Sequence, residues 1–219
     1  MKDLKHLIYF ESLLENANNE LVQKAQAEGN LALGYTCYHV PEALLNVGNC
    51  FSVRLRAPHT GSIDIATYYM SNYTCEFARA LVERGIEGGY QFLDAMIGVD
   101  ACSMMNRAME HFEILKVNDK PNFFVTHCDI PYKITDYTLD SYVKQMRIHV
   151  LDKLTEVYGV DTSDAAIRQA VKEHNEVCSI VSEMAEMRKA ENPVITGYEF
   201  HVINLVTYVC PKALILPYL

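Results

Sequence analysis

Short runs of apolar, strand-forming residues alternate with helical patterns between residues 31 and 125. Four runs predict buried strands, at 31–38, 51–55, 93–99 and 122–125. The segments between them predict helices, at 41–47, at 63–83 with a break near Asn72, and at 103–114. A chain that alternates in this way folds with parallel strands and with its helices on the faces of the sheet. The pattern therefore predicts an α/β fold with a Rossmann-like (flavodoxin-like), mainly parallel sheet flanked by helices.

An amphipathic pattern precedes this region. Leucine, isoleucine and valine recur at mixed three and four spacing from residue 2 to residue 28, and Gly29 and Asn30 then interrupt them. The spacing predicts one long helix. We therefore expect an N-terminal helix in residues 1–30, followed by an α/β domain in residues 31–135.

The rest of the chain, residues 136–219, predicts a helical segment. Long amphipathic helices are expected at 140–158 and 163–190. Cap candidates are Asp161 and Thr162 for the second of these helices, and Thr196 with Glu199, at capping-box spacing, for a last one. The chain stops in the apolar stretch 210–219, whereas a chain terminus is normally solvated, so we expect it to be truncated; the alternative is a natural end that docks on a partner.

Composition excludes several classes of protein. Half of the 219 residues are hydrophobic (50%), which is enough for a sizeable core. The net charge of −9 argues against a nucleic-acid-binding protein, because phosphate binding needs clustered lysine and arginine. No apolar stretch approaches the length of about 18 residues typical of a membrane span, and the start of the chain lacks a signal-peptide core. We therefore expect a soluble cytoplasmic protein.

The seven cysteines are odd in number and widely spaced, which favours buried thiols or metal ligands over disulfides. There is no C-x-x-C pair and no H-E-x-x-H, and the glycines at 85–89 match neither a phosphate-binding loop nor a dinucleotide fingerprint. Taken singly, these cysteines and the histidines His39, His59 and His127 are more often core or loop residues than ligands. An iron–sulfur cluster with ligands from distant loops stays open, because loops at strand ends of an α/β sheet converge.

Several blocks of residues stand in an order typical of one enzyme family. They are Gly-Tyr-Thr-Cys-Tyr-His-Val-Pro-Glu-Ala-Leu at 34–44, Cys-Glu-Phe-Ala-Arg at 75–79, Tyr-Gln-Phe-Leu-Asp at 90–94, Cys102, and more weakly Asn175 and the block at 192–199. From about residue 30 to about residue 205, this series resembles the 2-hydroxyacyl-CoA dehydratase and benzoyl-CoA reductase superfamily. The chain is similar to the N-terminal half of a D-component-type subunit.

The resemblance implies a [4Fe-4S] cluster and some of its ligands. By matching motifs, it assigns Cys75 and Cys102 as cluster ligands and makes residues 31–135 the cluster-binding domain. Cys37 is a candidate for a further ligand, with a buried thiol as its alternative role. Thr36 and Glu42 are implied as neighbours of the substrate. The third cluster cysteine of the family lies in a second α/β half, before which this chain stops.

The implied activity is that of a lyase. Family members remove water from a 2-hydroxyacyl-CoA to give an enoyl-CoA through a ketyl radical, after an ATP-dependent iron–sulfur activator has donated one electron. Radical chemistry is invoked because the hydrogen at the β-carbon is too weakly acidic for ordinary general-base catalysis. A second dehydratase subunit, or a second copy in a homodimer, is the implied partner, and the chemistry is oxygen-sensitive.

Two alternatives remain open from the sequence. One is a reductase of the same superfamily, which acts on an aromatic acyl-CoA or carries a double-cubane cluster. The other is a non-catalytic scaffold subunit or fragment. One departure from the family is Cys178, where relatives often carry arginine after the asparagine that matches Asn175.

Overall fold

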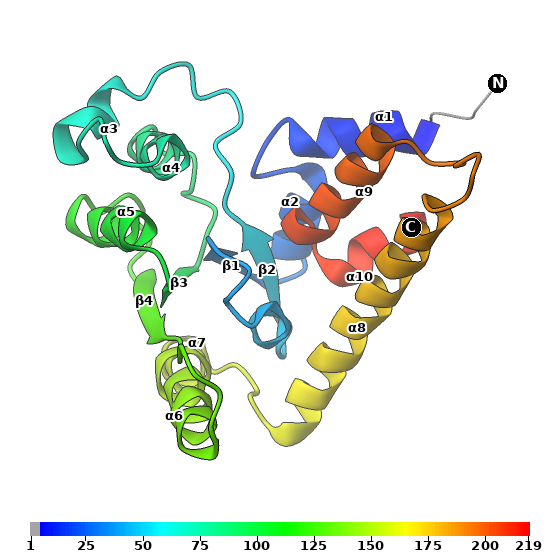
Figure 1. The fold of residues 1–219 in the computed structure, drawn as a ribbon. Coiled ribbons are helices and arrows are strands. Elements are labelled where there is room, and N and C mark those ends of the chain that lie inside the picture. Colours follow the sequence, from blue (N-terminus) through cyan, green and yellow to red (C-terminus); the bar gives the residue numbers. More distant parts are fainter. Residues whose placement is uncertain (1–4) are drawn as a thin grey trace.

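The computed structural model describes residues 5–219 and has a four-stranded sheet at its centre (Figure 1). The strands are β1 (Leu31–Tyr35), β2 (Cys50–Arg54), β3 (Ala95–Asp100) and β4 (Phe124–Asp129). They are all parallel and lie in the order β2-β1-β3-β4. The predicted α/β fold with a parallel, Rossmann-like sheet is confirmed.

Helices cover both faces of the sheet because side chains alternate along each strand. On one face, Phe51, Met96 and their neighbours pack against α4 (Glu76–Ile86) and α5 (Ser103–Ile114). The short helix α3 (Asp64–Tyr69) precedes α4, so the predicted break in this region is confirmed. The helix predicted at 103–114 is confirmed as α5.

On the other face, Leu33 and Ile97 belong to a second core. The elements that cover it are the 3-10 helix η1 (Glu42–Asn46), α6 (Asp136–Met146), the π-helical turn η2 (Arg147–Leu151) and α7 (Asp152–Tyr158). The last three are continuous, and Gly159 ends them in a left-handed conformation (φ 68°) that costs glycine little. The helix predicted at 140–158 is therefore present but starts earlier, because Thr135 caps it.

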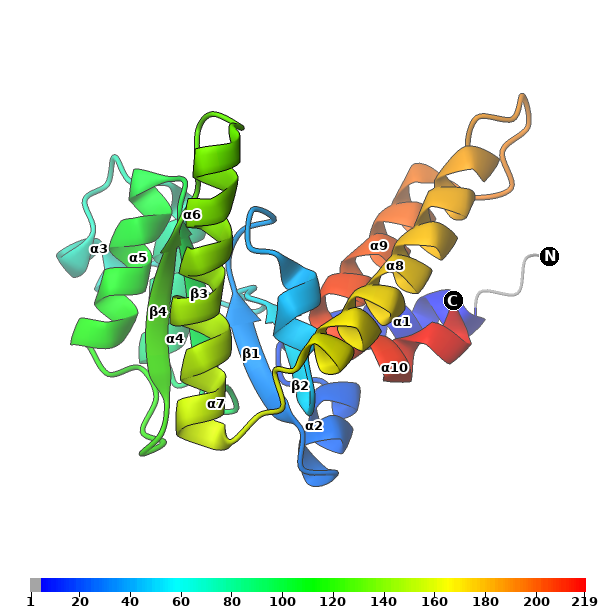
Figure 2. The ribbon, with the colours of Figure 1, turned by 90° about the horizontal axis from the view of Figure 1, so that it is seen from below.

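The N-terminal and C-terminal helices gather beside the edge strand β2 (Figures 1 and 2). They are α1 (Lys5–Leu14), α2 (Glu20–Ala27), α8 (Asp164–Met187), α9 (Gly197–Val209), α10 (Lys212–Ile215) and the 3-10 turn η3 (Leu216–Tyr218). A third core joins Phe10 and Leu13 of α1 to Val206 of α9 and Ile215 of α10. Helix α9 also packs on β2 and so covers a strand edge that would otherwise be open to pairing.

The predicted single helix from 2 to 28 is wrong, and its first three residues lie outside the described part of the chain. Between residues 5 and 28 the structure has two helices, α1 and α2, because Asn19 starts the second one. The Asn19 side chain accepts hydrogen bonds from the backbone of Leu21 and Val22, as an N-cap does. Its amide also donates to the carbonyl of Val209, 3.3 Å away. A contact with α9 therefore holds the break in place.

The structure confirms the predicted cap of α9 and corrects the predicted cap of α8. The capping box at Thr196 and Glu199 is confirmed: Thr196 N donates to Glu199 Oε2 at 2.6 Å, and Glu199 N donates to Thr196 Oγ1 at 3.2 Å. Helix α8 is capped by Ser163 and not by Asp161 or Thr162, since the Ser163 hydroxyl accepts from Ala166 N. Helix 41–47 is present as the shorter 3-10 helix η1.

A buried ion pair ties the helical layer to the sheet domain. Lys212 of α10 donates to Glu42 of η1 at 2.6 Å, and the two side chains are only 4% and 8% exposed. Glu42 Oε1 also accepts from Ser52 at 2.9 Å, and Lys212 also donates to the carbonyl of Thr207. Removal of one partner from such a pair is costly, because it leaves the other charge buried and uncompensated.

We expect Lys212→Met to lower the free energy of unfolding by about 3–5 kcal/mol, because methionine keeps the apolar stem and leaves the Glu42 carboxylate unpaired. The matched control is Lys189→Met. Its partner is Glu186 at 2.6 Å, but both side chains are exposed (72% and 67%), so the cost should stay below about 1 kcal/mol. Chemical denaturation measures both, and equal costs would contradict a stabilising role for the buried pair.

Candidate functional site

Three of the cysteines lie on the edge of the sheet where the strands end. Cys37 follows β1, and Cys102 follows β3 and directly precedes α5. Cys75 directly precedes α4, on the connection that leaves β2. Because the strand order reverses between β1 and β3, their carboxyl ends form the crevice at which open α/β sheets bind ligands. Cys37 and Cys102 flank this crevice.

Cys75 and Cys102 have the same local setting. Each is the residue before a helix, each is an exposed free thiol, and neither side chain caps its helix by a hydrogen bond. Helices α4 and α5 pack against each other, and Figure 1 shows them as neighbours on one face of the sheet. Helix N-termini stabilise negative charge, which is the charge of a ligating thiolate. Both thiols are therefore available to a metal.

The remaining cysteines differ in their surroundings. Cys37 is partly buried and packs against the second core. Burial raises the pKa of Cys50, Cys128 and Cys210 to about 12 each, so these thiols stay protonated and inert. Cys178 is exposed, but it lies on α8. The thiols of Cys75 and Cys102 are thus set apart by exposure together with their place at the carboxyl edge.

Residues 5–219 contain no group of three or more histidine, cysteine, aspartate or glutamate side chains placed to hold a metal ion. A [4Fe-4S] cluster ordinarily takes four cysteine ligands. The two exposed thiols at the carboxyl edge therefore fit part of a cluster's ligand set.

Within residues 5–219, no helix combines the length and the apolar character needed to cross a membrane.

The two predicted substrate neighbours lie in different surroundings. Thr36 follows β1, is 3% exposed, and its hydroxyl has no hydrogen-bond partner within the described residues 5–219. Glu42 is held by Ser52 of β2 and by Lys212 of α10. The structure therefore puts Glu42 in the wall between the sheet and the helical layer.

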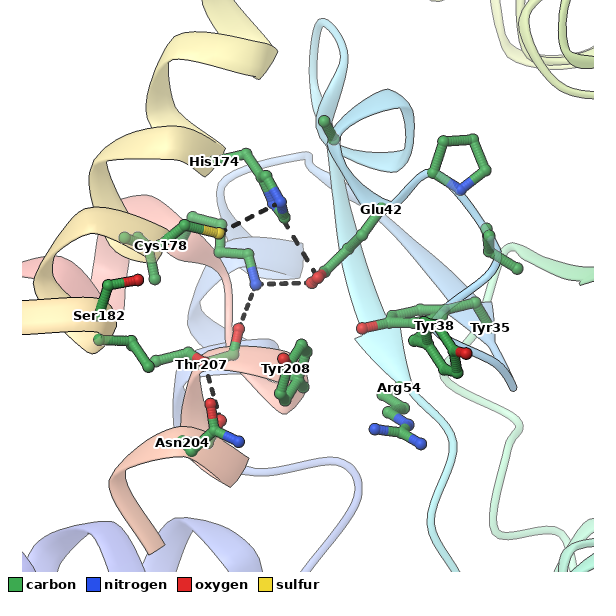
Figure 3. Close-up of a pocket in the computed structure, with 16 residues that line it drawn as sticks. Tyr35, Tyr38, Glu42, Arg54, His174, Cys178, Ser182, Asn204, Thr207 and Tyr208 are labelled. Carbon is green, nitrogen blue, oxygen red and sulfur yellow. Dashed lines mark hydrogen bonds and ion pairs between the residues drawn. The ribbon is translucent and has the colours of Figure 1, made fainter. Parts of the chain in front are cut away.

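A cavity of about 490 Å³ lies between the sheet and the helical layer (Figure 3). It is lined on the sheet side by Tyr35, Tyr38, Val40, Pro41, Glu42, Ala43 and Arg54, and on the helical side by His174, Val177, Cys178, Val181, Ser182, Asn204, Thr207, Tyr208 and Lys212. Glu42 Oε2 faces His174 Nδ1 at 4.0 Å, and His174 Nε2 lies 3.4 Å from Cys178 Sγ. Burial is the main cause that lowers the pKa of His174, so its ring is neutral near pH 7.

Local sequence patterns identify little of this cavity. Among its polar residues, they single out only Glu42 for a role, and Cys178 only as a departure from the family. Lys212 carries the one signal that was available: it is a charge inside the apolar stretch 210–219, and a buried charge requires a partner. That partner is 170 residues away along the chain, so no local pattern identifies it.

Comparison with known proteins finds the same family that the sequence blocks resemble. The family model described as 2-hydroxyglutaryl-CoA dehydratase, D-component, matches residues 37–219. The chain is 22% identical to the beta subunit of (R)-2-hydroxyglutaryl-CoA dehydratase from Acidaminococcus fermentans, over 76% of this chain and 45% of that protein. It is 18% identical to the beta subunit of (R)-phenyllactyl-CoA dehydratase from Clostridium sporogenes, over 93% of this chain and 53% of that protein.

A reductase component is about as similar as these dehydratase subunits. One of the subunits of benzoyl-CoA reductase from Thauera aromatica is 18% identical, over 82% of this chain and 46% of that protein. The chain spans about half the length of the curated relatives it matches. Since the family model covers most of the sequence, the chain belongs to the 2-hydroxyglutaryl-CoA dehydratase D-component family, within the 2-hydroxyacyl-CoA dehydratase and benzoyl-CoA reductase superfamily.

Proposed function

We propose that this chain is part of a subunit of an oxygen-sensitive 2-hydroxyacyl-CoA dehydratase, which removes water from a 2-hydroxyacyl-CoA to give an enoyl-CoA through a ketyl radical. Cys75 and Cys102 would anchor its [4Fe-4S] cluster. One observation carries the proposal: the two exposed free thiols begin neighbouring helices at the carboxyl edge of the sheet. Family membership supports the reaction class.

The reversal of strand order at β1 and β3 supports the placement of this site. Cys102 follows one of these two strands, and Thr36 and Cys37 follow the other. The unpartnered Thr36 hydroxyl is free to hydrogen-bond a polar ligand group there. Thr36 thus stays in the proposal as a neighbour of the substrate, and Cys37 as a further candidate ligand. Glu42 stays as a second neighbour, although its charge is engaged by Lys212.

The reaction explains why a cluster is needed. When bound, a low-potential cluster supplies a single electron, which makes elimination feasible despite the weak acidity of the β-hydrogen. The task of the chain's own residues is to hold the metal and to exclude water. Cys75 and Cys102 supply thiolates, and the ligands still missing would come from the second half of the subunit.

Exposed aromatic and aliphatic side chains support a partner at the same edge. Tyr38, Tyr68, Tyr73, Tyr132, Ile134 and Tyr137 are each 74–94% exposed and lie on connections that leave the carboxyl ends of strands. Aromatic side chains are enriched in protein interfaces. We propose that a second dehydratase subunit, or a second copy of the subunit, covers this edge, and that an ATP-dependent iron–sulfur activator donates the electron. The relatives are themselves named as subunits.

Iron content tests the cluster assignment. In the full-length subunit, produced and reconstituted without oxygen, we expect Cys75→Ser and Cys102→Ser each to lose most of the bound iron and acid-labile sulfide, because each removes an anchoring thiolate. Cys178→Ser is the matched control, since it removes a thiol that is also exposed but lies on α8. Equal iron in all three variants would defeat the assignment.

The partner surface has its own test. We expect Ile134→Asp to weaken co-purification with the second subunit, because it puts a charge into an apolar surface at the carboxyl edge. Ile114→Asp is the control: Ile114 is also exposed (67%, against 93% for Ile134) but ends α5 at the opposite edge of the sheet. Equal retention of the partner by both variants would contradict an interface at the carboxyl edge.

The similarity to a benzoyl-CoA reductase component favours one alternative, a reductase that acts on an aromatic acyl-CoA. The two functions differ in their net electron balance. A dehydratase recovers its electron after each elimination, whereas a reductase consumes electrons in proportion to product. Measurement of activator-derived electrons consumed per product formed therefore separates the two.

A further inference from the structure

We propose that the cavity between the sheet and the helical layer binds a small organic monocarboxylate, held by Arg54 and by the hydroxyl of Tyr35. The cavity is walled by η1, β2 and helices α8 to α10, whereas Cys75 and Cys102 begin α4 and α5. In both views of the fold, α4 and α5 lie on the other side of the molecule from α8, α9 and α10 (Figures 1 and 2). The proposal does not depend on the cluster.

The charges of the cavity leave one cation without a counter-ion. Glu42 and Lys212 neutralise each other at 2.6 Å, and His174 is neutral near pH 7 because burial lowers its pKa. Arg54 forms no ion pair or hydrogen bond with any residue in the described range 5–219, and its guanidinium lies 5.7 Å from the centre of the Tyr208 ring. A single unpaired guanidinium favours a ligand with a single negative charge, and it matches the geometry of a carboxylate.

Tyr35 supplies an independent sign of a missing ligand. Its side chain is 1% exposed, yet its hydroxyl lies within hydrogen-bond distance of no acceptor among residues 5–219. Burial, and then the Glu42 carboxylate, which is close enough to attract the hydroxyl proton, raise the pKa of Tyr35 against the opposing effect of Arg54, so the hydroxyl keeps its proton and can donate it. Figure 3 shows Tyr35 and Arg54 on the same side of the cavity. A buried donor without an acceptor is costly, and a bound carboxylate would supply the acceptor.

The rest of the lining indicates the body of the ligand. Val40, Pro41 and Ala43 form one apolar wall, and Val177 and Val181 of α8 form another. A volume of about 490 Å³ falls within the 300–1,000 Å³ range usual for small-molecule sites. An acid with a short apolar tail thus places its carboxylate at Arg54 and its tail between these walls. Phosphate lacks such a tail and leaves the walls unfilled.

Cys178 provides the readout, because it is exposed and lines the cavity. In the protein without a cluster, we expect sodium hexanoate to slow the alkylation of Cys178 by iodoacetamide saturably, with half-protection in the millimolar range. Cys75 and Cys102, which are also exposed, should react at unchanged rates and serve as internal references. Mass spectrometry of the digested protein follows each thiol separately. Sodium chloride at equal concentration controls for ionic strength.

Neutral and mutant controls make the test specific. Hexanamide, which has the same tail but no charge, should not protect Cys178. Arg54→Gln should weaken protection by hexanoate at least about tenfold, and Tyr35→Phe should weaken it less, because it removes one hydrogen bond but leaves the positive charge of Arg54 in place. Arg107→Gln, at an exposed arginine on α5, should leave protection unchanged. Circular dichroism checks that each variant is folded.

Three outcomes would each overturn the proposal. They are the absence of protection by hexanoate, equal protection by hexanamide or inorganic phosphate, and undiminished protection in folded Arg54→Gln. None of them bears on iron loading by Cys75 and Cys102, so failure here and failure of the cluster assignment are distinguishable.

Discussion

The parallel arrangement of all four strands places every connection that leaves a strand at one edge of the sheet. The reversal of order between β1 and β3 opens a crevice at that edge, with Thr36 and Cys37 on one side and Cys102 on the other. Cys75 reaches the same edge from the connection after β2. Residues that are far apart in sequence thus share an edge because of topology alone, and the proposed cluster site depends on this constraint.

A second constraint operates between the sheet and the helical layer. The Glu42–Lys212 pair is almost fully desolvated, so each charge depends on the other and on the hydrogen bonds from Ser52 and to Thr207. The pair fixes α10 against η1 and closes one side of the cavity. Within the cavity, the negative charge of Glu42 and the positive charge of Lys212 cancel each other, so the positive charge of Arg54 determines the sign of the net charge there. The same interaction therefore contributes both to the fold and to the selectivity that we propose for the cavity.

Family membership and the structure bear on different parts of the functional argument. The family model and the named relatives indicate a dehydratase or reductase subunit, and the chain spans about half of those relatives. The structure adds that two thiols are exposed at helix starts, and that residues 5–219 hold no larger group of metal-ligating side chains. Both are consistent with the cluster that we propose, for which Cys75 and Cys102 would supply two of the thiolates.

Features that depend on a few neighbouring residues can be predicted from the amino-acid sequence. The alternation of strand and helix patterns predicts the parallel sheet, Thr196 and Glu199 predict the start of α9, and the family motifs single out Cys75 and Cys102. The break at Asn19, which contacts the carbonyl of Val209, and the cavity around Arg54 and Lys212 arise from long-range packing. A local pattern acts through neighbours within one or two turns, whereas Glu42 and Lys212 are 170 residues apart and meet only when the chain closes around them.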